Sequence, residues 1–373
     1  LFVATGTGSG KTECFMWPMI SKLVREAKVN KKSWHQRGVR AMMLYPMNAL
    51  VSDQLGRLRR MIGADAFYEL FVDYTGEERR PQFGMYTGRT PYAGEIKSAQ
   101  DKALAATLQS NLIDRDEETV NQLKKMGKYP AKIDLERFID GLLNGKHLTD
   151  NRDSEMITRF EMQQHTPDIL VTNYSMLEYM LMRQEEQSIW EDTRAWLSED
   201  ANNKLLFIID EAHMYRGASG GEVALLVRRF INKLEVPREK IQFILTSASI
   251  PKNEDEKVKQ FVVDLTALTD ETNISIITGS QEQVDELSAK AVDVEQLATF
   301  DIDSLHGDTK LSGIHRLGEI VGLDVSKCSF SDEREVEIWL YGELTKIKPL
   351  LSIMKCCRGH AVAFADLAKN VFP

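Results

Sequence analysis

The chain has 373 residues, 43% of them hydrophobic and 28% charged, which allows two globular domains; its net charge of −9 neither indicates a nucleic-acid binder nor excludes one with a local basic groove. Four cysteines are too few for a disulfide framework in a chain of this length, which favours a reducing, cytoplasmic setting. No apolar run approaches the roughly 20 residues of a membrane helix, so we expect no membrane partner.

The chain opens on LFVATGTGSGKTE, which reads as the end of a strand followed at once by a glycine-rich loop. Because Leu1 is not a start methionine, we expect the chain to be part of a longer protein. Further short apolar runs alternate with helical patterns such as residues 15–27 and 223–234. Strands that are apolar on both faces and alternate with helices predict an α/β fold, with a parallel sheet covered by helices on both faces. The predicted strands are Phe2–Ala4, Val39–Tyr45, Phe83–Tyr86, Ile169–Thr172, Leu205–Ile209, Phe243–Leu245 and Ile274–Ile277.

Two stretches depart from this alternation. Residues from about 95 to 165 are charged and helix-prone, which predicts a helical insertion between two strands of the sheet. Residues 281–373 are again charged and helical, and their end, GHAVAFADLAKNVFP, would suit a winged-helix element. We therefore expect a main α/β domain over residues 1–280 and an appended or inserted helical segment over residues 281–373.

The segment TGTGSGKT has the pattern of a phosphate-binding loop. Small residues let backbone N–H groups approach phosphate oxygens, and the start of the following helix favours negative charge. Lys11 would reach the β- and γ-phosphates of ATP, and the Thr12 hydroxyl would bind Mg²⁺. A glycine-rich turn with a surface lysine is the alternative, and Thr5 stands where the pattern normally has its first glycine. The other predicted contacts to the nucleotide are Thr5, Gly6, Thr7, Gly8, Ser9 and Gly10.

A second polar motif follows the apolar run of residues 205–209, where LLFIIDEAH ends in two carboxylates. Charges at the end of a buried strand need a partner. Asp210 would hold Mg²⁺, and Glu211 would orient and activate an attacking water. An isolated Asp-Glu pair could instead cap a helix, but the phosphate loop in the same chain favours the metal site.

Asp210-Glu211-Ala212-His213 resembles motif II of the superfamily 2 helicases, in their DEAD/DEAH (DExH) branch. In the family's order, TGTGSGKT resembles motif I, YPMNALVSDQ motif Ia, YTGRT motif Ib, PDILVTNYSMLEYML motif Ic, and Ser247-Ala248-Ser249 motif III. These six motifs cover about residues 1–250 and imply the first RecA-like lobe of a P-loop NTPase. HMYRGASGGEVALLVRRF and NYSMLEYM are further similar to the bacterial MrfA/YprA-like helicases and to the large helicases of phage-defence islands.

The resemblance also implies roles for single residues. His213, Ser247 and Ser249 would couple the phosphate site to the strand-binding face. Motifs Ia, Ib and Ic would bind the sugar–phosphate backbone of a single strand without reading its bases. Taken alone, each position fits an ordinary turn or surface site, and only their order along the chain favours binding. The implied nucleic-acid contacts are Pro46, Asn48, Thr87, Gly88, Arg89, Thr172 and Asn173.

The function implied is that of the N-terminal motor lobe of a helicase or translocase that uses ATP and Mg²⁺, with DNA favoured over RNA as the track. No motif after Ser249 fits a second RecA-like lobe, whose arginines would reach the γ-phosphate. We therefore expect that lobe elsewhere in the full-length chain and little hydrolysis by this fragment alone. The alternative is a non-catalytic, nucleotide-switched scaffold in a phage-defence or repair complex, although the intact Glu211 favours the enzyme.

Several other residues have a functional and a more ordinary interpretation. Cys356 and Cys357 with His360 lack the spacing of structural zinc sites, so packing is the favoured interpretation. The arginines of RLRR at residues 57–60 could touch nucleic acid or lie on a solvated helix face. Trp34 and Trp190 could stack on a base, but burial is the commoner outcome.

Overall fold

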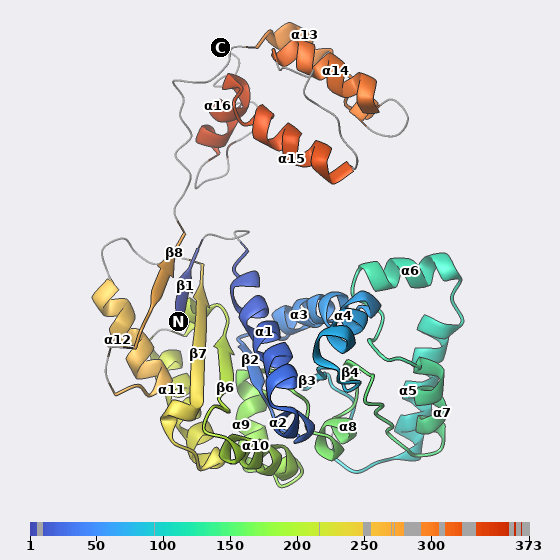
Figure 1. Cartoon of the computed structure of the whole chain (residues 1–373), viewed down its shortest axis with the longest axis vertical. Helices are drawn as coiled ribbons and strands as arrows, with labels where there is room; N and C mark the ends of the chain where they lie inside the picture. Colours follow the sequence, from blue (N-terminus) through green and yellow to red (C-terminus); the bar gives the residue numbers. More distant parts are fainter. Residues whose placement is uncertain are drawn as a thin grey trace. The chain divides into compact units, whose positions relative to one another are not determined.

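The computed structural model describes residues 1–5, 10–92, 94–215, 217–248, 255–269, 271, 273–279, 292–305, 310–322, 333–357, 362 and 367. The chain divides into two compact units, residues 1–280 and residues 281–373 (Figure 1). None of the helices in these described ranges combines the length and the apolarity needed to cross a membrane.

The first unit is built on a parallel sheet in the order β4-β3-β5-β2-β6-β7-β1-β8. The α/β fold predicted from the sequence is confirmed, and each predicted strand is present with small shifts of its ends. The two-residue strand β4, which pairs with β3 at the edge of the sheet, was not predicted. The strands are β1 (Phe2–Ala4), β2 (Ala41–Tyr45), β3 (Phe83–Tyr86), β4 (Glu155–Met156), β5 (Ile169–Asn173), β6 (Leu205–Ile209), β7 (Ile241–Ser247) and β8 (Ile276–Thr278).

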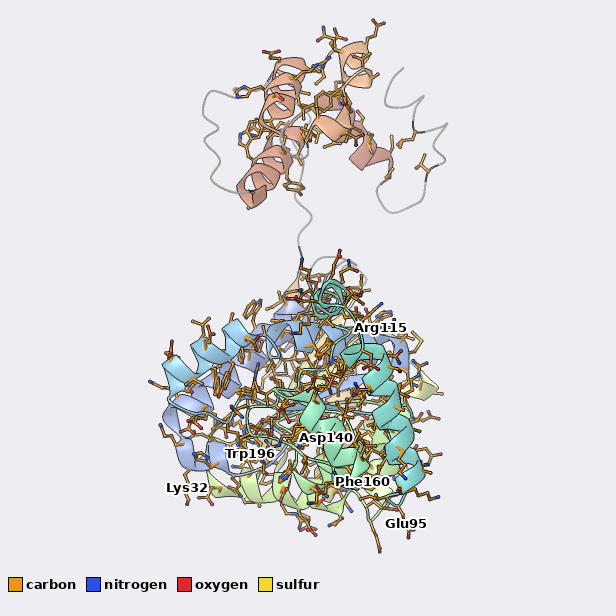
Figure 2. All side chains as sticks on the ribbon, turned by 90° about the vertical axis from the view of Figure 1, so that its right-hand side faces the viewer. Lys32, Glu95, Arg115, Asp140, Phe160 and Trp196 are labelled. Atoms are coloured by element: carbon orange, nitrogen blue, oxygen red, sulfur yellow. The ribbon has the colours of Figure 1, made fainter. Side chains whose placement is uncertain are left out.

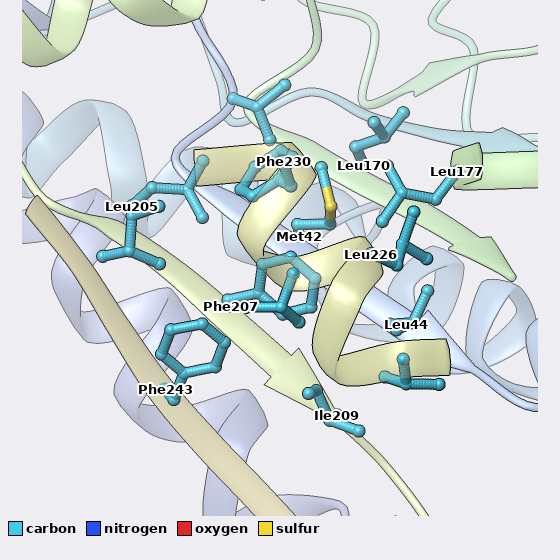
Figure 3. Packing of buried hydrophobic residues seen from close by; sticks show 14 of the residues in the cluster. Met42, Leu44, Leu170, Leu177, Leu205, Phe207, Ile209, Leu226, Phe230 and Phe243 are labelled. Atoms are coloured by element: carbon cyan, nitrogen blue, oxygen red, sulfur yellow. The ribbon is translucent and has the colours of Figure 1, made fainter. Parts of the chain in front are cut away.

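Helices cover both faces of this sheet, because the side chains of its central strands are apolar on both sides. One face packs on α1, α3 and α4, and the other on α9, α10, α11 and α12. On the second face, the Phe207 ring lies 5.2 Å from the rings of both Phe230 and Phe243, measured between centroids (Figure 3). The helices are α1 (Glu13–Val29), α2 (Lys31–His35), α3 (Asn48–Met61), α4 (Asp65–Thr75), α5 (Ser98–Leu108), α6 (Glu117–Lys125), α7 (Leu135–Leu143), α8 (Arg159–Gln164), α9 (Tyr174–Met182), α10 (Gln187–Glu199), α11 (Ala218–Leu234) and α12 (Asp255–Thr266), with short helical turns at Gln109–Ile113, Ala212–Met214 and Arg238–Lys240.

The segment between β3 and β5 forms a helical subassembly with a small core of its own (Figure 2). It holds α5 to α8 and strand β4. Its buried Lys132 ammonium contacts the carboxylates of Asp153, at 3.0 Å, and Glu161. The segment is joined to α3 by Arg59, which binds the Glu155 carboxylate with two hydrogen bonds of 2.6 and 2.7 Å. The core residues are Ala105, Leu108, Leu112, Leu135, Phe138, Ile139 and Leu142.

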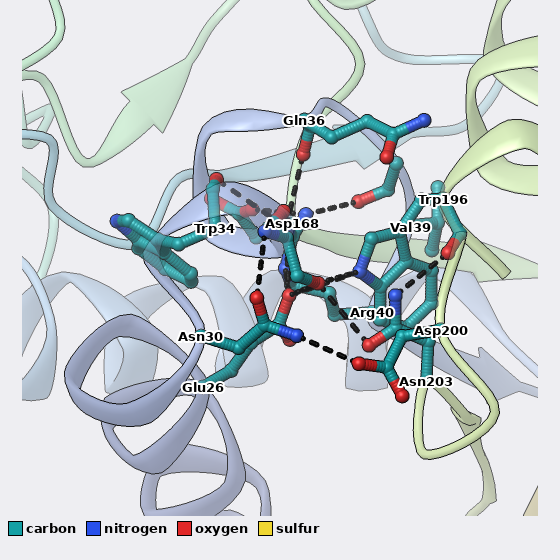
Figure 4. Close-up of polar contacts among 12 residues, drawn as sticks. Glu26, Asn30, Trp34, Gln36, Val39, Arg40, Asp168, Trp196, Asp200 and Asn203 are labelled. Atoms are coloured by element: carbon teal, nitrogen blue, oxygen red, sulfur yellow. Dashed lines mark hydrogen bonds and ion pairs between the residues drawn. The ribbon is translucent and has the colours of Figure 1, made fainter.

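A buried charged network lies where β2 and β5 begin (Figure 4). The guanidinium of Arg40 is fully buried and contacts Asp168 at 2.9 Å and Glu26 at 2.9 Å. A second arginine, Arg79, reaches the other oxygen of Asp168 at 2.8 Å. Its guanidinium also stacks over Trp34, 4.2 Å from the ring centroid. The two arginines hold the pKa of Asp168 below its usual value against the opposing effect of burial.

The second unit is helical in its described part. A short helical turn, Ile302–Leu305, packs against α14. Leu317, Val321 and Ile347 are buried at its centre, with further apolar side chains packed around them. The GHAVAFADLAKNVFP segment, predicted to suit a winged helix, lies outside the described residues apart from two isolated positions. The helices are α13 (Val294–Ala298), α14 (Lys310–Val321), α15 (Glu333–Leu344) and α16 (Lys348–Cys356).

Candidate nucleotide and nucleic-acid site

The predicted phosphate site lies at the carboxyl edge of the sheet, where three neighbouring strands end. Ala4 of β1 is in register with Ser247 of β7, and the backbone N–H of Thr5 donates to the Ser247 carbonyl at 3.2 Å. Strand β6, which carries Asp210 at its end, is the next neighbour of β7. Loops that leave the carboxyl ends of parallel strands meet at one edge, and ligands of open α/β sheets bind there. Of the predicted loop, Gly6, Thr7, Gly8 and Ser9 lie outside the described residues.

Glu211 is the centre of the described part of this site. Its Oε1 accepts a hydrogen bond from Nζ of Lys11 at 3.4 Å, which joins residues 200 positions apart. The Lys11 and Glu211 side chains are 9% and 23% exposed. The other carboxylate oxygen, Oε2, lies 3.2 Å from Nδ1 of His213, which is near enough for an ion pair when the imidazole is protonated, although the two atoms are not aligned for a hydrogen bond. The fold therefore brings together the lysine of motif I with the glutamate and histidine of motif II.

Asp210 is buried beside this cluster and is held by two donors. The Thr246 hydroxyl and the backbone N–H of Glu211, the latter at 2.9 Å, both donate to its Oδ1. Burial, as the largest effect, raises the pKa of Asp210 above its ordinary value. A carboxylate whose charge is disfavoured by burial gains from a nearby cation.

The Mg²⁺ site stays a prediction, and the residues present are compatible with it, because Mg²⁺ takes one or two protein ligands and completes its shell with water and phosphate oxygens. Asp210 supplies the carboxylate, and Thr12 stands at the start of α1 with no hydrogen bond from its side chain to the helix end. Among the described residues, no group of three or more histidine, cysteine, aspartate or glutamate side chains is placed to hold a metal by itself.

The backbone at Glu211 is in the left-handed region, with φ 52° and ψ 44°. For a residue other than glycine this conformation costs about 1–2 kcal/mol. It turns the chain out of β6 directly into the short helical turn Ala212–Met214. Strained non-glycine residues cluster at functional sites, and here the strain falls on the residue predicted to act on water.

Two buried tyrosines near Asp210 were not assigned a role from the sequence. The hydroxyl groups of Tyr45, at the end of β2, and Tyr215, after motif II, have no hydrogen-bond partner within the described part of the chain. Burial raises the pKa of both hydroxyls, and the negative charge of Asp210 adds to the effect. A cleft of about 450 Å³ opens beside Tyr215, His213 and Ser247. Tyr45 lies inside the YPMNALVSDQ motif, and this position was the sequence signal from which a role for Tyr45 could have been predicted.

Motif III is described only in part. Ser247 is buried at the end of β7, beside the described end of the phosphate-loop strand β1. Its partner in the prediction, Ser249, lies outside the described residues. The coupling role of both serines stays a prediction.

The residues predicted to contact nucleic acid include exposed, half-buried and buried ones. Gly88 and Arg89 are exposed at the tip of the loop after β3. Thr87 and Thr172 are buried, and their side chains shape the backbone: the Thr172 hydroxyl donates to the Tyr86 carbonyl at 2.7 Å, and the Thr87 hydroxyl accepts from the Arg89 N–H at 3.2 Å. Of these four residues, only Gly88 and Arg89 are exposed, and their contact with nucleic acid stays a prediction.

Motifs Ia and Ic are joined to each other. Tyr45 and Asn173 are in register on β2 and β5, and the Asn173 side-chain amide donates to Oδ1 of Asn48 at 2.6 Å. The Asn173 side-chain oxygen also caps α9 by accepting from the N–H of Met176 at 2.8 Å. Pro46, which lies between Tyr45 and Asn48 in the sequence, is half-buried just before α3 begins. Asn48 and Asn173 therefore form one polar surface at the same edge as Glu211.

Most of the residues with two interpretations have the ordinary one. Trp34 and Trp190 are fully buried, so neither can stack on a base in this structure. Arg59 and Arg60 bind groups of the chain itself, Glu155 and the Met126 carbonyl. His360, the predicted neighbour of the two C-terminal cysteines, lies outside the described residues.

The sequence of this chain is similar to a helicase family and to two known proteins. The DEAD/DEAH box helicase family model matches residues 1–114 and 112–257. Druantia protein DruE of Escherichia coli is 38% identical over 405 residues, which cover 100% of this chain and 22% of that protein. An ATP-dependent helicase of Methanocaldococcus jannaschii, itself uncharacterized, is 28% identical over 101 residues, or 27% of this chain and 13% of that protein.

Among solved structures, the DUF1998 helicase MrfA has a TM-score of 0.35 and 17% identity, with 97% of this chain and 37% of that chain covered. The chain thus spans about a fifth of the length of DruE, at 22%. More than half of its residues match the family model, over the stretch that carries Lys11, Asp210 and Glu211. This chain belongs to the DEAD/DEAH box helicase family, of which it carries a first RecA-like lobe.

Proposed function

We propose that this chain is the N-terminal motor lobe of a DEAH-type helicase or translocase, which couples binding and hydrolysis of Mg-ATP to movement on a single strand of DNA. The observation that supports the proposal is the cluster of Lys11, Glu211 and His213 beside the buried Asp210. A switch that only binds nucleotide does not need a carboxylate placed to act on water. The chain keeps that carboxylate and positions it by a strained backbone.

In this proposal each side chain of the nucleotide site has a separate role. Mg²⁺, when bound with the nucleotide, supplies charge neutralisation at the phosphates, and Asp210 and Thr12 are the residues that would hold it. The Lys11 ammonium leaves Glu211 and neutralises charge on the β- and γ-phosphates. The freed Glu211 carboxylate orients the attacking water and accepts its proton. His213, whose Nδ1 lies 3.2 Å from Oε2 of Glu211, would couple the phosphate site to the strand-binding face.

The surface proposed to contact the nucleic acid is the polar edge formed by motifs Ia, Ib and Ic. Arg89 and Gly88 are exposed there, and Asn48 and Asn173 stand at the same edge of the sheet. Short polar groups, backbone N–H groups and one arginine suit phosphates and sugars rather than base edges. We therefore expect binding that is nearly independent of sequence and weakened by salt.

The rest of the motor is proposed to lie in a longer chain. DruE is about five times as long as the region it shares with this chain, since the chain covers 22% of it. A second RecA-like lobe in that additional length would bring arginines to the γ-phosphate, which can contribute several orders of magnitude in rate. Residues 1–373 alone should bind nucleotide weakly and hydrolyse it slowly. We place the protein in the cytoplasm.

The test compares the full-length protein with residues 1–373 and with Lys11→Ala in a phosphate-release assay, with and without single-stranded DNA or RNA. We expect DNA to stimulate turnover by the full-length protein, Lys11→Ala to abolish it, and residues 1–373 to show little. Nucleotide binding without turnover by the full-length protein would instead support the non-catalytic scaffold. Greater stimulation by RNA than by DNA would overturn the assignment of the track.

A further inference from the structure

The exposed loop that carries Gly88 and Arg89 is held from inside the protein by an arginine of another segment. We propose that Arg159, the first residue of α8, is a positioning residue for strand binding, because it fixes the loop Thr87–Thr90 with Gly88 and Arg89 facing outward. The inference rests on the proposed function, since it assumes that this loop contacts the strand.

Arg159 touches the loop at its beginning and at its end. Its Nη2 donates to the Thr87 carbonyl at 2.8 Å, and its backbone N–H donates to the Pro91 carbonyl at 2.8 Å. The guanidinium lies over the ring of Tyr86, 5.1 Å from the centroid. Arg159 is only 3% exposed. It therefore cannot bind the strand itself, and any effect on binding must pass through the loop.

The loop by itself is closed by weaker, uncharged hydrogen bonds. The Thr90 hydroxyl donates to the Met85 carbonyl at 2.6 Å and accepts from the Thr87 N–H at 2.9 Å. The Thr90 N–H donates to the Thr87 carbonyl at 3.2 Å, the same oxygen that Arg159 binds. A hydrogen bond from a charged donor is stronger than a neutral one, more so when it is buried. The guanidinium is thus the strongest single restraint that the structure places on this loop.

Helix α8 also holds the residue that precedes the loop. Gln163, one turn after Arg159, donates to the Tyr86 hydroxyl at 3.1 Å, and that hydroxyl donates to the buried Glu186 at 2.6 Å. The Tyr86 carbonyl accepts from Thr172 of motif Ic. Through Tyr86, the contact of α8 therefore reaches both motif Ib and motif Ic.

The position of Arg159 is fixed by the end of the helical subassembly. Thr158 and Glu161 form a capping box around the start of α8, with the Thr158 side chain and the Glu161 carboxylate each accepting a backbone N–H. Both residues are fully buried. A rigid helix start presents the guanidinium to the loop, so the order of the subassembly sets the order of the strand-binding loop.

The experiment measures the affinity of the full-length protein for labelled single-stranded DNA by fluorescence anisotropy, at several salt concentrations, together with the melting temperature. The variants are Arg159→Ala and the conservative Arg159→Lys, each also combined with Arg89→Ala. Arg80→Lys is a matched control. Arg80 is also 3% exposed, donates to the Ala64 carbonyl at 3.1 Å and stacks over the Tyr68 ring at 5.0 Å, in a segment with no proposed role in binding.

We expect Arg159→Ala to raise the dissociation constant roughly tenfold, since a charged and buried hydrogen bond is lost, and Arg159→Lys to restore part of the affinity. In the Arg89→Ala background, Arg159→Ala should add less than about twofold, because positions that act through one loop are not additive. Arg80→Lys should lower the melting temperature about as much as Arg159→Lys does, but it should leave the affinity for DNA unchanged.

Additive effects of the Arg89 and Arg159 substitutions would overturn the inference, as would equal weakening of binding by Arg80→Lys at equal loss of stability. These two outcomes would assign Arg159 to general packing. If the unsubstituted protein binds no single strand under any salt condition, the proposed function fails and the inference fails with it. The three results are distinguishable in one set of titrations.

Discussion

The contact between Lys11 and Glu211 predicts an opposite effect of one substitution on nucleotide binding and on turnover. At 3.4 Å the two charges attract by about 1 kcal/mol in water and about 5 kcal/mol at an effective dielectric constant of 20. The side chains are 9% and 23% exposed, so desolvation and ordering cancel part of this attraction. A net stabilisation of about 1 kcal/mol remains, and a nucleotide must overcome it to recruit the lysine.

Glu211→Gln removes the charge and keeps the shape, so the left-handed backbone at this position is not further strained. We expect the variant to bind nucleotide about fivefold more tightly, because Lys11 no longer has to give up a contact with Glu211 that stabilises it by about 1 kcal/mol. Turnover should fall by roughly 100-fold or more, because the group that accepts the proton of water is gone. A fluorescent ATP analogue measures the affinity, and DNA-stimulated phosphate release by the full-length protein measures the turnover.

The control is Glu222→Gln, which removes the same charge from an exposed position on α11. It should change neither quantity by more than about twofold, because interactions between exposed charges are weak. If Glu211→Gln bound nucleotide more weakly than the unsubstituted protein, the lysine would not be held back by this carboxylate. If turnover fell less than tenfold, Glu211 would not be the group that acts on water.

Three further predictions concern single side chains of the first unit. Burial raises the pKa of Asp210, so the charged form destabilises the fold at pH 7, and this cost disappears as the pH falls through the raised pKa. Asp210→Asn should therefore raise the melting temperature of the nucleotide-free protein by about 2 °C while abolishing turnover. A lower melting temperature of the variant would contradict the reasoning. Burial lowers the pKa of His147, so the unfolded chain takes up the proton first, and the free energy of unfolding should fall by up to about 1.4 kcal/mol per pH unit below about pH 6.5. Urea denaturation of His147→Gln at pH 7.5 and 5.5 should show a smaller loss of stability between the two pH values, and the remaining loss comes from His165, whose pKa is also lowered. The same loss as in the unsubstituted protein would refute the assignment to His147. Asn173→Asp keeps the oxygen that caps α9 but replaces the amide donor to Asn48 by a charge, so melting should stay within about 2 °C while DNA affinity drops several-fold in anisotropy titrations; unchanged affinity would separate this pair from the strand-binding surface.

Much of the first unit could be predicted from the sequence because its strands are buried on both faces. An apolar run such as residues 205–209 has no other plausible place than the centre of a parallel sheet. Asp210 and Glu211 could be assigned for the same reason, since carboxylates at the end of such a run need a partner. The pairing of Glu211 with Lys11 then follows from strand ends that meet at one edge.

The parts that were missed depend on contacts between residues far apart in the chain. Strand β4 begins with Glu155, a residue untypical of strands, which is accepted there because Arg59, 96 positions earlier, binds both carboxylate oxygens. Arg159 belongs to a charged, helix-prone stretch, and no local pattern distinguishes it from a solvated arginine. Its burial follows from the Thr87 carbonyl and the Tyr86 ring, which only the fold brings to it.

The buried ion pair of Arg40 and Asp168 fixes the register of the two β-strands that lead to motifs Ia and Ic. Arg40 immediately precedes β2 and Asp168 immediately precedes β5, and these strands are neighbours with Ala41 opposite Ile169. A slip of one residue would turn the apolar side chains to the wrong faces and would also leave a buried charge unpaired, at a cost of about 3–5 kcal/mol. Each strand has five residues. An ion pair at the opposite edge of the sheet therefore sets which residues of the two β-strands lie side by side at the carboxyl edge, where Asn48 and Asn173 are proposed to contact a nucleic-acid strand.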